Sequence, residues 1–186
     1  KSMTFSPVKL GDFQGKKGET LFVYIEKDKR VLLLGLGKKD KANVDSLRKS
    51  FSAIFKSTKD KKISKISLMV PKVGKMTLKE VLQAITEGVL LVNYSFDELK
   101  HDVIKENPVT FLEALCFIGA TKKDLEVCTK VQTIFSGVYL TRNLVNGNAD
   151  DITPEKLAEI ALNLSSSHPK IKTTVFDKKR IEKEKM

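Results

Sequence analysis

The chain has 186 residues, of which 41% are hydrophobic and 31% charged, and it carries a formal net charge of +11. This composition indicates a globular protein of one domain, or of one domain and part of a second, and excludes a fibrous or low-complexity chain. No apolar run approaches the roughly 20 residues that cross a bilayer. The opening residues, Lys1 to Pro7, lack the basic and then apolar pattern of a secretory signal.

The positive charge is concentrated near the start of the chain. Residues 1–76 carry 19 Lys and Arg against 7 Asp and Glu, a surplus of 12, whereas residues 77–186 carry 15 against 16. Such asymmetry is compatible with a polyanionic partner. Lysines that only keep a surface solvated produce the same pattern, and we prefer that simpler explanation.

Two predicted strands and a helix follow a glycine-rich loop at residues 11–18. Residues 20–26 alternate and are rich in β-branched and aromatic side chains, while residues 31–34 are continuously apolar, as in a strand buried on both faces. We expect the two to form a hairpin. From Asn43 the apolar residues recur at three- and four-residue steps, which predicts a helix with one buried face: Val44, Leu47, Phe51, Ile54 and Phe55.

The middle of the chain continues the alternation of strand and helix. Residues 63–70 are predicted to be a strand, and Thr77 with Glu80 forms a capping box that begins a helix to about Tyr94. Asn107 and Pro108 mark a break. From the residue types alone, residues 109–118 fit either a strand or a helix.

A long helix and two shorter elements complete the pattern. Thr121 and Asp124 indicate a helix start, and the helical period persists for some 25 residues, roughly 37 Å at 1.5 Å per residue, before it stops at residues 146–148. Thr153 and Pro154 begin another helix, residues 171–176 are predicted to be a short strand, and a charged helix starts at Asp177. Strands that alternate with helices predict an α/β layered fold. The final strand and helix do not complete a βα unit, which implies missing residues after Met186. Together with a start at Lys1, this leads us to expect that residues were removed from both ends.

Two glycine-containing loops superficially resemble nucleotide-binding motifs. After Gly35 and Gly37 the third glycine of a dinucleotide fingerprint would fall on Asp40, whose carboxylate would repel a pyrophosphate. The glycines of residues 11–16 are one residue too close for a phosphate loop, and Lys17 replaces the required Ser or Thr. We interpret both as structural turns.

The remaining reactive residue types are also better explained structurally. His101 and His168 lack metal-ligand spacing, and residues 165–167 are serines without a nucleophile-elbow context. The pair Asp150 and Asp151 precedes a helix start, where negative charge is favourable.

The cysteines, Cys116 and Cys128, lie among apolar residues and are too far apart for a CxxC motif, which favours core packing. Nothing in the sequence indicates export, so we expect reduced thiols in a cytoplasmic protein.

Four stretches of the sequence are similar to those of one known family. The four stretches occur in the same order as in that family and extend over nearly the whole chain. They resemble the cytosolic leucyl aminopeptidases, which are hexameric two-metal enzymes that include bacterial aminopeptidase A. The stretches are residues 15–20 with 31–38, residues 87–97 with a Tyr-x-Phe-Asp signature, residues 137–146 and residues 148–158.

The resemblance implies a domain organisation. Residues 1–120 would form a macro-domain-like α/β domain, a three-layer mixed sheet with helices on both faces. Residues 121–147 would be a long connecting helix, and residues 148–186 the truncated start of a second, catalytic α/β domain. The resemblance also implies that residues 109–118 are a strand, and that the family's first strand is absent or shortened before Gly11.

The resemblance implies a function for a longer parent protein. The family hydrolyses amino-terminal residues from peptides with two divalent ions, Zn or Mn. Its Lys, Asp and Glu ligands and its Asn-Thr-Asp-Ala-Glu-Gly-Arg signature belong to the later domain. None of that pattern occurs here, so we expect no catalytic, cofactor-binding or metal residue in this chain. The parent is expected to be a cytoplasmic homohexamer without a membrane partner.

Two other functions stay open. Residues 1–76 suit a basic nucleic-acid-binding module, because residues 38–65 hold ten basic groups against three acidic ones. Lysine dominates there, so the charges would neutralise phosphates without reading bases; some bacterial members of the family bind DNA. A macro-type domain that recognises a nucleotide-like molecule is less favoured, since no phosphate loop is present.

Overall fold

The computed structural model describes residues 3–8, 20–25, 30–36, 42–60, 62–96 and 110–186. The chain divides into two compact units, Lys1–Tyr139 and Leu140–Met186. No helix in the described ranges is both long enough and apolar enough to span a bilayer. The loop at residues 11–18, His101, Asp40 and the break at residues 107–108 lie outside the described residues.

The first unit is built on a mixed sheet of five strands in the order β1-β5-β4-β2-β3. β1, β5 and β4 run parallel, whereas β2 is antiparallel to both of its neighbours. The pairing of β2 with β3 confirms the predicted hairpin. The strands are Thr4–Val8 (β1), Thr20–Ile25 (β2), Arg30–Gly35 (β3), Lys65–Met69 (β4) and Ala114–Ile118 (β5).

Two strand predictions are corrected by this sheet. The strand before Gly11, predicted to be absent or shortened, is not absent: β1 has five residues and pairs along its whole length with β5. It lies at a sheet edge, where a proline such as Pro7 is tolerated. Residues 110–113 are not strand, because the backbone of Leu112 is hydrogen-bonded to a side chain and not to a neighbouring strand. β3 is the other edge strand; the side chains of residues 31–33 lie outside the described part, so their burial stays a prediction.

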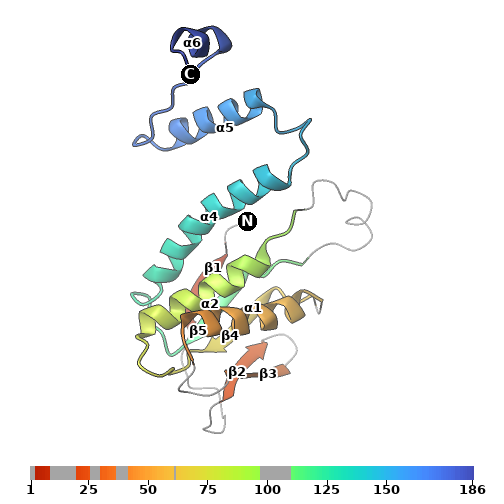
Figure 1. Ribbon diagram of the computed structural model, residues 1–186. Helices are drawn as coiled ribbons and strands as arrows, with labels where there is room; N and C mark the ends of the chain where they lie inside the picture. The colour runs from red at the N-terminus through yellow and green to blue at the C-terminus, as the bar shows by residue number, and fades with distance from the viewer. Residues whose placement is uncertain (1–2, 9–19, 26–29, 37–41, 61, 97–109) are drawn as a thin grey trace. The chain divides into compact units, whose positions relative to one another are not determined.

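Three helices of the first unit share one core with the sheet (Figure 1): α1 (Val44–Asp60), α2 (Leu78–Asn93) and the first part of α4 (Glu126–Asn146). The register places Ile66 beside Leu115 and Leu68 beside Phe117, and all four side chains are fully buried in that core. On the opposite face, Cys116 and Ile118 are also buried. The described residues thus give a mixed α/β fold, and the second helical layer stays a prediction.

α1 and α2 begin where their sequences predict, and α4 begins later. Asn43 accepts a hydrogen bond from the backbone of Ser46 at 2.8 Å and caps α1, and Thr77 with Glu80 forms the predicted capping box of α2. α4 begins at Glu126, later than predicted, because residues 122–125 form a turn. The predicted apolar positions of α1 and of the first part of α4 face the core. In α2 the predicted positions Val81, Leu82, Ile85 and Val89 are buried there, whereas Leu78 is exposed.

α1 and α2 approach each other closely at Gly88. A Cβ atom placed on this residue would lie 2.5 Å from the backbone oxygen of Arg48, and the hydroxyl of Ser52 donates to the Gly88 carbonyl at 2.9 Å. Only a residue without a side chain fits such a helix crossing, since the atom that it would meet belongs to the backbone.

The second unit contains the end of α4, α5 (Pro154–Ser167) and α6 (Lys178–Lys183). None of its side chains is classed as buried. The predicted strand at residues 171–176 is wrong, because these residues have no regular secondary structure and no partner strand in this unit. The charged helix predicted from Asp177 is present as α6, with the Asp177 side chain as its cap.

Candidate functional site

Two of the family-like stretches meet within the first unit, where the end of α2 lies beside α4. The ring of Tyr139, from the third stretch, lies 5.4 Å from that of Tyr94, from the second. It also makes an edge contact with Phe135 at 6.0 Å. The Tyr139 hydroxyl donates a hydrogen bond to the carbonyl of Leu90 in α2. Aromatic pairs at these separations are attractive, so α4 is attached to α2 up to the last residue of this unit.

Asn93 connects the end of α2 to the segment before β5. Its amide nitrogen donates to the carbonyl oxygen of Leu112 at 2.9 Å, and its amide oxygen accepts from the Leu112 N–H at 2.8 Å. One side chain thus satisfies both backbone groups of Leu112, as a neighbouring strand would. The role is structural, since both ends of the amide are occupied.

Glu87, also in the second stretch, connects α2 to α1. Its carboxylate accepts a hydrogen bond from the Arg48 Nε at 2.8 Å and one from the Gln83 amide at 2.9 Å. Arg48 further pairs with Asp45. The hydrogen bond to Glu87 raises the pKa of the Arg48 guanidinium above its ordinary value. The carboxylate therefore has its charge balanced within the protein, unlike a carboxylate that is available to bind a ligand.

The fourth stretch forms the start of α5. The Thr153 hydroxyl accepts from the Lys156 N–H at 3.3 Å, and Pro154 occupies the first helical position, as predicted. The backbone N–H groups of Asp151 and Ile152 both donate to the Asn148 carbonyl, at 3.0 and 2.9 Å. The carboxylates of Asp150 and Asp151 are exposed.

The cysteines and the described histidine occupy the structural positions expected for them. Cys116 and Cys128 are buried, and the Thr86 hydroxyl donates to the Cys128 sulfur at 3.2 Å. Burial raises the pKa of the Cys128 thiol, which opposes formation of a nucleophilic thiolate. His168 is exposed and ends α5, where its backbone N–H donates to the Leu164 carbonyl at 3.0 Å. Ser165 and Ser166 both bond back to the Leu162 carbonyl.

The described residues do not fit the pair of divalent ions that the family implies. In the ranges that the structure covers, no three His, Cys, Asp or Glu side chains lie together in a way that could hold a metal ion. The carboxylates of Glu80 and Asp124 accept hydrogen bonds at helix starts. We therefore assign no step of metal chemistry to these residues.

Two solved structures share the fold of this chain. A mutant of tomato leucine aminopeptidase matches with a TM-score of 0.73 at 22% identity, over 94% of this chain and 35% of that one. The bottromycin maturation enzyme BotP matches with a TM-score of 0.64 at 19% identity, over 90% of this chain and 38% of that one. At these identities the likeness establishes a shared mixed α/β fold.

Sequence comparison identifies the family. Residues 6–102 match the family model described as the N-terminal domain of the cytosol aminopeptidase family. The match covers more than half of the chain, so this chain belongs to the cytosol aminopeptidase family.

Curated relatives from two bacteria agree with the family match. A probable cytosol aminopeptidase from Protochlamydia amoebophila is 48% identical over 178 residues, which are 95% of this chain and 36% of the relative. One from Chlamydia abortus is 34% identical over 185 residues, 96% of this chain and 37% of the relative. The chain thus spans little more than a third of the length of these relatives.

Three residues with clear roles in this structure were not singled out in the sequence. Asn93, Glu87 and Tyr139 each connect two elements of the first unit. The available signal was their membership in the family-like stretches, and it did not indicate their partners.

Proposed function

We propose that the chain is the amino-terminal, non-catalytic part of a leucyl aminopeptidase whose full-length form removes amino-terminal residues from peptides. One observation carries the proposal: the chain matches only the first part of longer aminopeptidases. Residues 6–102 match an N-terminal domain. A relative called a probable cytosol aminopeptidase aligns with 95% of the chain, and this alignment uses 36% of the relative's length. The catalytic residues and the two divalent ions, Zn or Mn, would belong to that remaining part of the full-length form.

In this proposal the chain supplies a scaffold. Residues 1–120 would form the macro-like accessory domain, residues 121–147 the connecting helix, and residues 148–186 the start of the catalytic domain. The uninterrupted α4, which is attached to the first unit up to Tyr139 and continues to Asn146, supports the idea of a connecting helix. The full-length form would be a cytoplasmic homohexamer that acts on peptides.

The proposal predicts that the isolated chain is inactive. We expect the purified 186-residue chain, supplied with Mn²⁺ or Zn²⁺, to release nitroaniline from leucine p-nitroanilide no faster than buffer with the same metal. The full-length form, purified in the same way, is the positive control. Metal-dependent hydrolysis that co-elutes with the isolated chain on size exclusion would contradict the non-catalytic assignment.

A basic nucleic-acid-binding module remains the alternative, favoured by the surplus of 12 positive charges in residues 1–76. Within the described part of that region, Lys49, Lys56 and Lys62 are exposed. A gel-shift titration at increasing salt tests it: phosphate contacts give an affinity that falls steeply with salt. Absence of a shift at low salt removes this alternative.

A further inference from the structure

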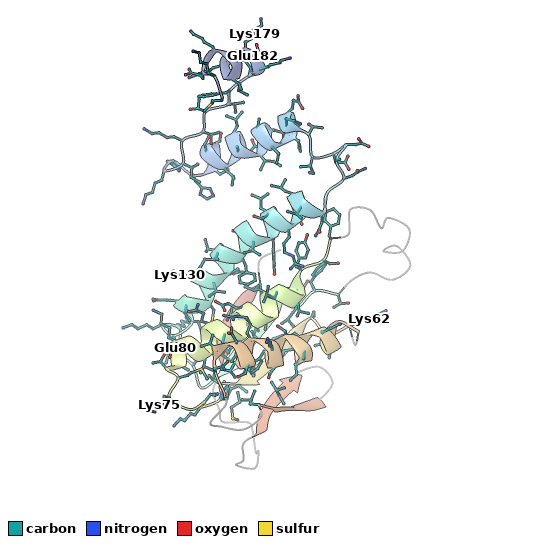
Figure 2. The ribbon with its side chains drawn as sticks, in the orientation of Figure 1. Lys62, Lys75, Glu80, Lys130, Lys179 and Glu182 are labelled. Atoms are coloured by element: carbon teal, nitrogen blue, oxygen red, sulfur yellow. The ribbon has the colours of Figure 1, made fainter. Side chains whose placement is uncertain are left out.

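A hollow of about 460 Å³ lies in the first unit where α2 and α4 begin. Figure 2 shows Lys130 and Glu80 on the same side of this unit, with Lys62 on the opposite side. The floor includes the buried side chain of Val127, and the walls carry mostly charged residues: Lys79, Lys123, Asp124, Glu126 and Lys130.

The three lysines of the hollow have no carboxylate in salt-bridge contact within the described part of the chain. Lys79, Lys123 and Lys130 are all exposed. They come from two helices and the turn before the second, so three ammonium groups from separate parts of the chain line one depression.

Two nearby carboxylates, Asp124 and Glu80, accept hydrogen bonds at the starts of the helices, although Asp124 also interacts electrostatically with Lys123. Asp124 accepts hydrogen bonds from the backbone N–H and the hydroxyl of Thr121, at 2.8 and 2.6 Å. Glu80 likewise accepts from the N–H and hydroxyl of Thr77, both at 2.8 Å. Glu126 is the one lining carboxylate without such a bond among the described residues. The lysine charge in the hollow is therefore only partly offset.

The position of the lysines in their helices adds a second argument. Lys79 lies in the first turn of α2, and Lys123 precedes the first turn of α4. The positive end of a helix dipole disfavours a cation at these positions and favours an anion. A bound anion would offset the positive charge that the three lysines place in the hollow.

We propose that this hollow binds a small phosphate-bearing anion, of the size of a polyphosphate chain, held by Lys79, Lys123 and Lys130. Lysine binds phosphate as a point charge without fixed geometry, which suits a polyphosphate chain better than a ligand that needs directional recognition. The site is distinct from the basic module of the alternative function, because none of its residues lies in residues 1–76.

Calorimetric titration of the whole chain with inorganic tripolyphosphate at low salt tests the proposal. We expect binding with a stoichiometry of one. The triple variant Lys79→Gln, Lys123→Gln and Lys130→Gln should weaken it by about tenfold, as expected for the loss of three exposed charge contacts. In amide NMR spectra, tripolyphosphate should shift the signals of Lys79 and Val127.

A matched triple variant separates a site from general charge. Lys49→Gln, Lys56→Gln and Lys62→Gln removes the same charge from exposed lysines that do not line the hollow, and it should leave the affinity within about twofold. Equal weakening by both triple variants, or no binding by the unmodified chain, would overturn the proposal.

Two checks keep the result decisive. Circular dichroism before titration verifies that both triple variants are folded. If the first is not, the single change Lys130→Gln, on the exposed side of α4, takes its place and should still weaken binding measurably. Replacing tripolyphosphate by a single-stranded oligonucleotide distinguishes the hollow from the basic module: the second triple variant should then lose more affinity than the first if residues 1–76 bind nucleic acid.

Discussion

The helices α2 and α5 begin in the same way but differ in how many residues they bury. Each starts at a threonine whose side chain caps the first turn, and they have similar lengths, 16 and 14 residues. α2 buries eight residues in the core of the first unit, whereas α5 buries none in the second unit. Local signals therefore specify that both are helices, but burial depends on what each apolar face meets, which the helix sequence does not encode.

The difference between the two units should be largest for removal of an apolar side chain. Phe51 is 0% exposed, so Phe51→Ala should lower the free energy of unfolding by about 3–5 kcal/mol. Leu157 is 45% exposed, so Leu157→Ala should cost less than about 1 kcal/mol. Urea denaturation followed by circular dichroism measures both. If Phe51→Ala fails to fold, Ile85→Val should still cost about 0.5–1.5 kcal/mol. Equal costs at Phe51 and Leu157 would mean that α5 has a partner in solution.

The helix crossing in the first unit gives the next largest effect. Gly88→Ala would place a methyl group against the backbone of Arg48, and should destabilise by about 1–3 kcal/mol. Gly137 is also in a helix, but nothing lies within 4 Å of its added Cβ. Gly137→Ala should therefore stabilise by about 0.5–1 kcal/mol, since alanine is the better helix former. The same urea experiment compares them, and an unchanged midpoint for Gly88→Ala would contradict the close approach.

Loss of a helix cap should have different effects on stability in the two units, and both effects should be smaller than those above. Thr77→Ala removes the cap of α2 and should cost about 1 kcal/mol in the unfolding of the first unit. Thr153→Ala removes the corresponding cap of α5. Its effect should be confined to helix content near residue 154 in hydrogen exchange, with no shift of the first unit's transition. A shift of that transition by Thr153→Ala would show that the two units unfold together.

The smallest expected effect is a pH dependence at the start of α2. Hydrogen bonds from the backbone N–H and hydroxyl of Thr77 lower the pKa of Glu80 below its ordinary value. A carboxyl group whose pKa is lower in the folded state stabilises the fold above the unfolded pKa, and this contribution is lost as pH falls through the folded pKa. Glu80→Gln should therefore lower the melting temperature slightly near neutral pH, and this difference from the unmodified protein should shrink as pH falls through the folded pKa. An equal fall of the melting temperature with pH in the two proteins would contradict a lowered pKa of Glu80.

The elements that could be predicted from sequence are those with short-range causes. The capping box of Thr77 and Glu80 joins residues three apart, and its hydrogen bonds are present. The apolar stripe of α1 is likewise a local repeat, and its positions face the core. The burial of Cys116 and Cys128 followed from their apolar neighbours.

The elements that could not be predicted depend on distant partners. β1 pairs with β5, so that Thr4 lies beside Ala114, and no pattern within either strand indicates the other. Residues 171–176 have the composition of a strand, but strand propensity alone forms no sheet without a neighbour. The contact between Asn93 and Leu112 was missed for the same reason, because the two residues are 19 positions apart.

The burial of both thiols has a practical consequence for spectroscopy. Cys116 is 3% and Cys128 0% exposed, and neither is part of a disulfide. A maleimide dye added to the folded protein therefore has no native target within reach, and a cysteine introduced at an exposed position can be labelled without first replacing the native pair. Fluorescence measurements that follow α5 or α6 can thus be made on the otherwise unaltered sequence.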